Sequence, residues 1–208
     1  MRGLDYRREE NYEEYLRLKQ NADYTDVTYD EQSGGVSAVH RLHKFAKMQG
    51  AYGMRHGDYE LAVVSILRNH GCLIVLEPES NSPGVKTCDG YLDDVPMEIK
   101  AVEGIGTWAI CTKLLMAEKQ HARCIILYFP EKKLYSTTRV EDGIGKYMAN
   151  PRLSKERTLN QIITICNNEI VAIWNKKAAP IEGRSIWEGF RRENGANSYT
   201  LSPSEAKL

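Results

Sequence analysis

The chain has 208 residues, 42% of them hydrophobic and 27% charged, so it can bury the core of one domain with extensions. Its 28 acidic and 28 basic residues balance, which argues against a protein that binds nucleic acid passively through net positive charge. An enzyme that obtains positive charge from a bound metal stays compatible with this balance.

The cysteines and the hydropathy of the chain indicate in which cellular compartment it acts. The five cysteines are odd in number, scattered and without a C-x-x-C pair, which is typical of reduced thiols: Cys72, Cys88, Cys111, Cys124 and Cys166. No stretch approaches the ~18 apolar residues of a spanning helix, and residues 1–5 lack a signal-peptide core. We expect a cytoplasmic protein without a membrane partner, unless it is delivered into a target cell or associates with a phage particle.

The first 56 residues look like an arm. Tyr12, Tyr15, Leu16 and Leu18 predict a weakly amphipathic helix over 8–21. Ser33-Gly34-Gly35 then breaks the chain, and a polar segment follows to His56. We therefore assign residues 1–56 to a helical or irregular N-terminal arm.

From residue 57 the pattern becomes regular. The apolar residues of 61–67 recur at helical spacing, Asp58 can cap this helix and Gly71 can end it. The pattern then predicts a strand at 72–76, a hairpin within 89–101, a helix at 108–120 that buries Ile110, Leu114, Leu115 and Ala117, a strand covered on both faces at 124–129, and a hairpin formed by 162–166 and 170–174. Residues 140–159 are amphipathic without a defined form.

These elements indicate an α/β (α+β) fold with a central mixed β-sheet flanked by helices. The core, residues 57–175, has the order α-β-β-β-α-β and a further C-terminal hairpin. Residues 176–208 lack a core pattern and form the expected tail, in which 184–192 is the most basic and aromatic segment.

The hairpin holds the most informative residues. If Asp93-Asp94 is a two-residue turn, counting outward pairs Leu92 with Val95 and Asp89 with Glu98. Because side chains alternate along a strand, Lys100 shares the face of Glu98. The same register sends Leu92, Val95, Met97 and Ile99 to the opposite face, where a core needs them.

Two carboxylates across a ladder repel by up to ~1 kcal/mol unless a cation offsets them. Mg²⁺ or Mn²⁺ suits such oxygen ligands, and Lys100 could also supply the positive charge. An ordinary solvated hairpin is the alternative.

The succession of a helix carrying Glu60, a strand, Asp89-Gly90, Glu98-Ile99-Lys100, a helix and an apolar strand resembles the PD-(D/E)xK nuclease superfamily. The resemblance covers residues 57–130, about a third of the chain, and has Cys88 in the place of the motif's proline. Within the superfamily the chain is similar to the C-terminal toxin domains of bacterial contact-dependent inhibition proteins and phage head-morphogenesis proteins.

The resemblance implies a restriction-endonuclease-like core and metal-dependent cleavage of DNA or RNA. It implies that Asp89 and Glu98 bind Mg²⁺ or Mn²⁺ with the backbone carbonyl of Ile99, and that Glu60 completes the acidic cluster. Lys100 would orient or acidify the attacking water. A nucleic acid substrate (DNA or tRNA) and a cognate immunity protein are the implied partners.

Other residues carry weaker signals. Lys113 and Gln120 on the helix after the hairpin could reach the phosphate, although each could equally be a solvated side chain. We expect Glu60 in the first turn of its helix, where the macrodipole favours an acidic residue without any chemistry. The three tryptophans are packing residues first, and base-stacking platforms only if exposed: Trp108, Trp174 and Trp187.

Histidines support a rival enzyme. His40 and His43 are one helical turn apart, with His56 nearby, and suit a substrate contact by His43, a solvated face or a transition-metal site. With Lys100 they could cleave tRNA without a metal. A third alternative is a structural phage or mobile-element protein.

Overall fold

The computed structural model describes residues 2–79, 87–150, 157–178, 185–192 and 199–203, and the side chains of those between 7 and 176. The chain folds into a mixed α/β architecture and divides into two compact units, Met1–Glu98 and Ile99–Leu208. The units differ from the expected segments 1–56, 57–175 and 176–208. The first 56 residues pack into a unit with the helix and strands that follow them.

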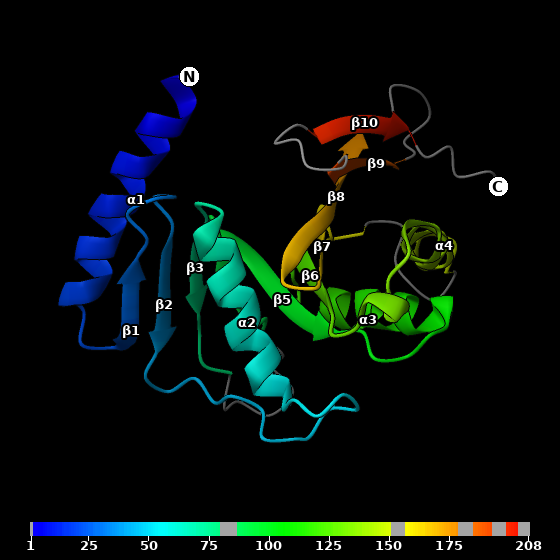
Figure 1. Cartoon of the computed structure of the whole chain (residues 1–208), viewed down its shortest axis with the longest axis horizontal. Helices are drawn as coiled ribbons and strands as arrows, with labels where there is room; N and C mark the ends of the chain where they lie inside the picture. The colour runs from blue at the N-terminus through cyan, green and yellow to red at the C-terminus, as the bar shows by residue number, and fades with distance from the viewer. Residues whose placement is uncertain (1, 80–86, 151–156, 179–184, 193–198, 204–208) are drawn as a thin grey trace. The chain divides into compact units, whose positions relative to one another are not determined.

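The first unit is built on a mixed sheet. Its elements are α1 (Arg2–Gln20), β1 (Tyr24–Tyr29), β2 (Val36–His40), α2 (His56–Asn69), β3 (Leu73–Leu76), β4 (Gly90–Leu92) and most of β5 (Val95–Ala101). The strands follow one another in chain order; β2 and β3 are parallel and the other pairs are antiparallel. Figure 1 shows α1 alongside β1 and β2, and α2 alongside β3.

Helices cover both faces of this sheet. Leu18 of α1 packs against Val36, Ala38, Leu73 and Val75, all of them buried. Alternate residues of β3 point to the other face, on the side of α2, which itself contacts β2 and β3. The helix at 8–21 is therefore confirmed, but it is a layer of the unit and not an arm.

β1 and β2 are strands that the sequence pattern does not predict. All residues of Val36–Val39 are buried, so this strand shows no apolar-polar alternation. Gly35 comes just before it because a Cβ at that position would lie 1.9 Å from the carbonyl oxygen of Arg68. The segment was read as polar because of the residues around it, from Arg41 onward.

The β4–β5 hairpin has the predicted register. Leu92 pairs with Val95, Tyr91 with Pro96 and Gly90 with Met97. Asp93 and Asp94 have positive φ angles of 48° and 63°, which a two-residue type I′ turn requires. The Asp93 carboxylate also accepts hydrogen bonds from the backbone nitrogen of Leu73 and from Arg7, which fixes the turn against β3 and α1.

Gly90 lets β4 approach β3. A Cβ at this position would lie 1.9 Å from the carbonyl oxygen of Val75, far inside van der Waals contact. Any side chain here would push the two strands apart. The glycine after Asp89 therefore has a packing reason of its own.

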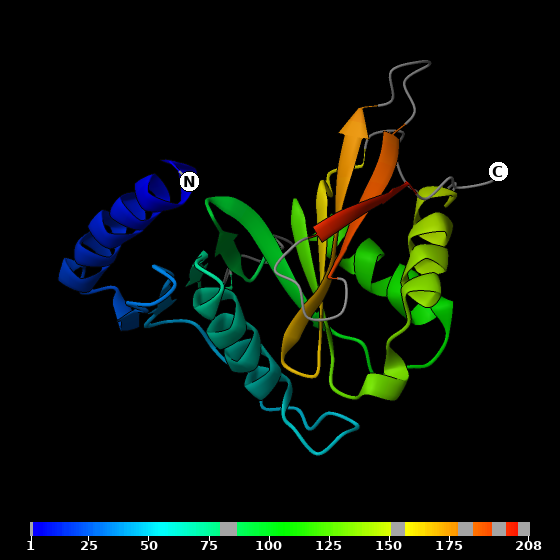
Figure 2. The same ribbon diagram turned by 45° about the horizontal axis from the view of Figure 1, so that its top comes forward.

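The second unit contains the end of β5 and a second run of strands. Its other elements are α3 (Thr107–Lys119), β6 (Cys124–Phe129), the 3-10 helix η1 (Lys132–Leu134), α4 (Thr137–Met148), β7 (Gln161–Cys166), β8 (Glu169–Ala178), β9 (Ser185–Arg192) and β10 (Tyr199–Pro203). β6 and β7 are parallel, and β7 to β10 are antiparallel. In Figure 2, α3 and α4 lie beside each other and β6 to β9 run side by side.

Most predicted elements of this unit are present. Every residue of β6 is buried, as the continuous apolar run predicted. Asn167 and Asn168 both have positive φ in the turn of the β7–β8 hairpin, and the undefined stretch contains α4. The buried stripe of α3 includes Cys111, whereas Leu115 is only half-buried.

Residues 176–208 were expected to form a loop-like tail, but they contain the strands β9 and β10. β9 pairs with β8 from Ser185 to Arg191, and β10 pairs with β9. Backbone hydrogen bonds to the edge of β8 make these strands, and such pairing leaves little trace in local composition. The side chains of 184–192, Trp187 among them, lie outside the described part.

We expect Asp94→Gly to stabilise the protein by roughly 0.5–1 kcal/mol, because glycine adopts the left-handed conformation of the second turn position without the steric cost of a Cβ. Equilibrium unfolding in urea measures the change.

Asp93→Gly is the matched control. It occupies the first position of the same turn but removes the acceptor for the backbone nitrogen of Leu73 and for Arg7. It should destabilise the protein, and equal effects of the two substitutions would contradict the assigned roles.

Candidate functional site

The hairpin brings the backbone of Asp89 to the carboxylate of Glu98. Asp89 precedes β4 by one residue, and its nitrogen donates a hydrogen bond to Glu98 Oε2 at 3.1 Å. This is the position that the register predicts for Asp89, across from Glu98. Two acidic residues therefore meet at the open end of the hairpin.

Glu98 is fully buried, with 0% of its surface exposed. The sequence pattern placed it on a charged face opposite the core, but in the structure Met97, Glu98 and Ile99 are all buried. Burying a carboxylate costs several kcal/mol unless hydrogen bonds or opposite charge offset the lost hydration. Folding alone would favour an apolar residue at this position.

A second acidic residue, Glu60 on α2, binds His43. Nε2 of His43 lies 3.1 Å from Glu60 Oε2, and Nδ1 lies 2.7 Å from the carbonyl oxygen of Glu77. The side chains are 4% and 16% exposed, respectively. Because both ring nitrogens face oxygen atoms, the contacts favour the protonated ring, in which both nitrogens can donate.

Competing effects act on His43. Burial lowers its pKa, but the hydrogen bonds to Glu60 and Glu77 and the negative charges of Glu60 and Asp89 raise it by more. The pKa of His43 therefore lies above the ordinary 6.5. The influence of Asp89 also shows that this residue lies near the His43–Glu60 pair.

Glu77 connects the two parts of the site. Its backbone nitrogen donates to the carbonyl oxygen of Asp89 at 2.9 Å, and its carboxylate accepts from the hydroxyl of Tyr24 at 2.6 Å. Burial and this bond raise the pKa of Tyr24 to about 12, so the phenol keeps its proton. We call the connected set Glu60, His43, Glu77, Asp89 and Glu98 the acidic network.

The acidic network joins four separate stretches of the first unit: the loop after β2, helix α2, the end of β3 and the β4–β5 hairpin. A pocket of about 230 Å³ lies on the Tyr24 side of Glu77, with Leu73 and Val75 among its lining residues. Arg17 also lines it, but its guanidinium is already bonded to Glu14. The pocket therefore offers little free positive charge for a phosphate.

The remaining predicted residues belong to the second unit. Lys100 follows Glu98 by two positions in β5, so the alternation of the strand gives both the same side. Lys113 on α3 is half-buried, and burial and the charge of Lys100 lower its pKa while Glu103 opposes the shift. Two ammonium groups therefore lie near each other, whereas Gln120 is the C-terminal cap residue of α3.

Within the described ranges, no three His, Cys, Asp or Glu side chains form a group that could hold a metal ion. A site for Mg²⁺ does not require such a group, since this ion keeps several waters and commonly uses one or two carboxylates together with substrate phosphates. Asp89 and Glu98 offer suitable oxygen donors. Glu60 instead has one carboxylate oxygen bonded to His43.

The helical pairing of His40 and His43 is wrong. His40 ends β2, where its Nδ1 accepts from the backbone nitrogen of Leu42, and no helix is assigned between β2 and α2. His43 and Glu60 are 17 residues apart, one in a loop and the other in a helix, so no local spacing in the sequence predicts their contact. A buried histidine facing an acid on the next helix was the missed feature.

No family model matches the chain, and no curated protein or solved structure does either. Among the described helices, none is long and apolar enough to cross a membrane.

We expect His43→Gln to destabilise the protein most at low pH. A raised pKa in the folded state contributes stability that is fully present below about pH 6.5 and is lost as the pH rises through the higher folded-state value. The loss should be roughly 3 kcal/mol near pH 6 and should shrink toward pH 9. Urea unfolding of both proteins across this range measures the difference.

Glu60→Gln provides the matched test, because it removes the charge while keeping the shape of the side chain. In this background the effect of His43→Gln should lose most of its pH dependence. An effect that stays equally pH-dependent would show that Glu60 does not hold the imidazolium.

Proposed function

We propose that the chain is a metal-dependent endonuclease that hydrolyses phosphodiester bonds in nucleic acid. The observation that supports this most is the buried carboxylate of Glu98, bonded to the backbone of Asp89 and followed by Lys100 two positions along the same strand. An acid at a buried strand position costs stability, and a catalytic role would account for its presence there.

Asp89 and Glu98 would hold the cation, Mg²⁺ or Mn²⁺, with the backbone carbonyl of Ile99 as a further oxygen donor. Such an ion makes water a usable nucleophile at neutral pH and stabilises the charge that grows on a phosphate. The donor set consists of hard oxygen atoms, which these ions prefer to nitrogen or sulfur.

The other residues have supporting roles in this proposal. Lys100 lies on the same side of β5 as Glu98, where its ammonium would stabilise negative charge on a phosphate and orient a water. His43 is a positioning residue: it holds Glu60 on one side and the Glu77 carbonyl on the other. The hydrogen bond from the Glu77 nitrogen to the Asp89 carbonyl in turn fixes the position of Asp89 at the start of the hairpin.

The metal-independent ribonuclease gains no support from His43. A general base needs a free nitrogen within reach of the substrate, whereas both nitrogens of this buried ring already contact oxygen atoms of Glu60 and Glu77. In the proposed nuclease His43 only positions Glu60 and Glu77, so its contacts with them are compatible with its role. The buried acid at Glu98 favours an enzyme over a structural phage protein, because its burial costs stability that a catalytic role would offset.

We also propose that the nuclease acts as a bacterial or prophage toxin module with a cognate immunity protein, which rests on the resemblance of residues 57–130. Expression in bacteria tests this proposal directly. The wild-type chain should arrest growth and Glu98→Gln should not, at matched protein levels.

We expect Glu98→Gln and Lys100→Ala each to lower cleavage by at least roughly 100-fold, because each removes a group that acts at the reacting phosphate. Purified protein with plasmid DNA and bulk tRNA as substrates, in Mg²⁺ or Mn²⁺, provides the assay. Glutamine keeps a carbonyl oxygen that can still accept from the Asp89 nitrogen, so the fold should survive.

Asp94→Asn is the matched control, since it alters an exposed carboxylate of the same hairpin. It should cleave at the wild-type rate. Wild-type protein that leaves both substrates intact with either ion, or cleaves them equally in EDTA, would refute the proposed function.

Cation binding has its own readout. We expect millimolar Mg²⁺ or Mn²⁺ to raise the melting temperature of the wild-type protein, because a ligand of the folded state stabilises it by mass action. Asp89→Asn and Glu98→Gln should abolish this shift while Asp94→Asn retains it. Equal shifts in all four proteins would place the ion elsewhere.

A further inference from the structure

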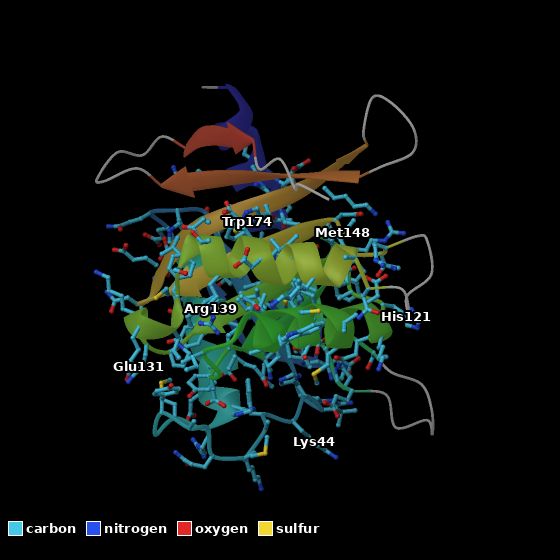
Figure 3. The ribbon with its side chains drawn as sticks, turned by 90° about the vertical axis from the view of Figure 1, so that its right-hand side faces the viewer. Lys44, His121, Glu131, Arg139, Met148 and Trp174 are labelled. Atoms are coloured by element: carbon cyan, nitrogen blue, oxygen red, sulfur yellow. The ribbon has the colours of Figure 1, made fainter. Side chains whose placement is uncertain are left out.

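The second unit displays a large aromatic side chain to solvent. Trp108, in the first turn of α3, is 62% exposed, and Ile105 in the preceding loop is 79% exposed. In contrast, Trp174 on β8 is 1% exposed and belongs to the core (Figure 3). Exposing a tryptophan forfeits burial worth about 1.5–3 kcal/mol for a large apolar side chain, so folding does not explain its position.

The segment that carries Trp108 is held firmly. Arg139 of α4 donates to the carbonyl oxygens of Gly104 and Gly106, and Lys146 donates to the hydroxyl of Thr107. Figure 3 shows Arg139 and Met148 toward opposite ends of α4, which lies along α3. These hydrogen bonds therefore fix the backbone on either side of the start of α3, and with it the position of Trp108.

The two helices also approach closely. A Cβ added at Gly143 of α4 would lie 2.6 Å from the side chain of Ile110, so a glycine is needed where the helices meet. This contact fixes α4, and with it Lys146, relative to the start of α3.

A cation accompanies the aromatic ring. The ammonium of Lys146 lies 5.1 Å from the centre of the Trp108 ring, within the range of a cation–π contact. The first turn of α3 contains no acidic residue, and no side chain caps its N-terminus. The positive end of the helix dipole and the ammonium therefore act together near the ring.

We propose that Trp108, Ile105 and Lys146 form a stacking platform for an unpaired base of a nucleic acid strand, with Lys146 contacting the adjacent phosphate. Aromatic rings bind bases of any sequence by stacking, and nearby cations follow the backbone. Naming a single strand as the substrate class rests on the proposed nuclease function.

The chemistry of the platform distinguishes a strand from other partners. A base pair inside a duplex keeps its faces stacked on its neighbours, so an exposed tryptophan gains most from an unpaired base. Stacking on Trp108 and a phosphate contact from Lys146 use groups that unpaired DNA and RNA share. The platform should therefore bind unpaired DNA and RNA about equally.

Binding of fluorescent oligothymidine and oligouridine in EDTA tests the inference without any cleavage. We expect Trp108→Ala to weaken binding of both strands roughly tenfold, and Trp108→Phe to recover part of the loss because it retains a ring. A blunt duplex of the same length should bind more weakly than either strand. Lys146→Gln should reduce the dependence of binding on salt concentration.

Met116→Ala is the matched control, because Met116 is also apolar, lies on α3 and is 42% exposed. It should bind as the wild type does. Unchanged melting temperatures would show that Trp108→Ala acts on binding and not on folding. Equal affinities of wild type and Trp108→Ala for both strands, or a preference for the duplex, would overturn the inference.

This experiment separates the two proposals. A protein that binds single strands through Trp108 but never cleaves them would retain the platform and lose the nuclease. A protein that cleaves through Glu98 while Trp108→Ala binds normally would retain the nuclease and lose the platform.

Discussion

The conformation of two aspartates controls the geometry of the acidic network. Asp93 and Asp94 both adopt left-handed backbone angles, and a turn of this type allows one register between β4 and β5. A shift by one residue would turn Glu98 to the opposite side of the sheet and carry Asp89 away from it. The bonds from Asp93 to Leu73 and Arg7 hold this register against the rest of the unit.

Burial of both faces of the sheet changes the chemistry of the residues within it. A carboxylate at the surface of a hairpin would be hydrated and would repel its neighbour only weakly. At Glu98 the surrounding sheet removes water, so hydrogen bonds and nearby charges act through a lower dielectric. At His43 the two effects oppose each other: burial lowers its pKa, and the bonds to Glu60 and Glu77 raise it above the ordinary value. The acidic network is therefore a consequence of the layered fold.

Local patterns predicted what depends on neighbours in sequence. Asp93-Asp94 and Asn167-Asn168 predicted the turns in which they lie, and the run Cys124–Phe129 predicted a buried strand. The sequence could not reveal β9, whose pairing with β8 is a backbone property, or the contact of His43 with Glu60, which requires α2 to lie beside the loop after β2. The alternation of polar and apolar residues in β5 predicted that Glu98 lies on an exposed, charged face. This was wrong, because the sequence of one strand does not show that both faces of its sheet are covered.

The acidic network also has a consequence for how the protein is made. His43 and Glu98 are 55 positions apart, and the contacts between them pass through residues 77 and 89. A ribosome must therefore release the hairpin from its exit tunnel before Glu98 can join the earlier residues of the acidic network. Translation that stops short of β5 leaves a chain without Glu98, so the acidic network forms only after this strand has been made.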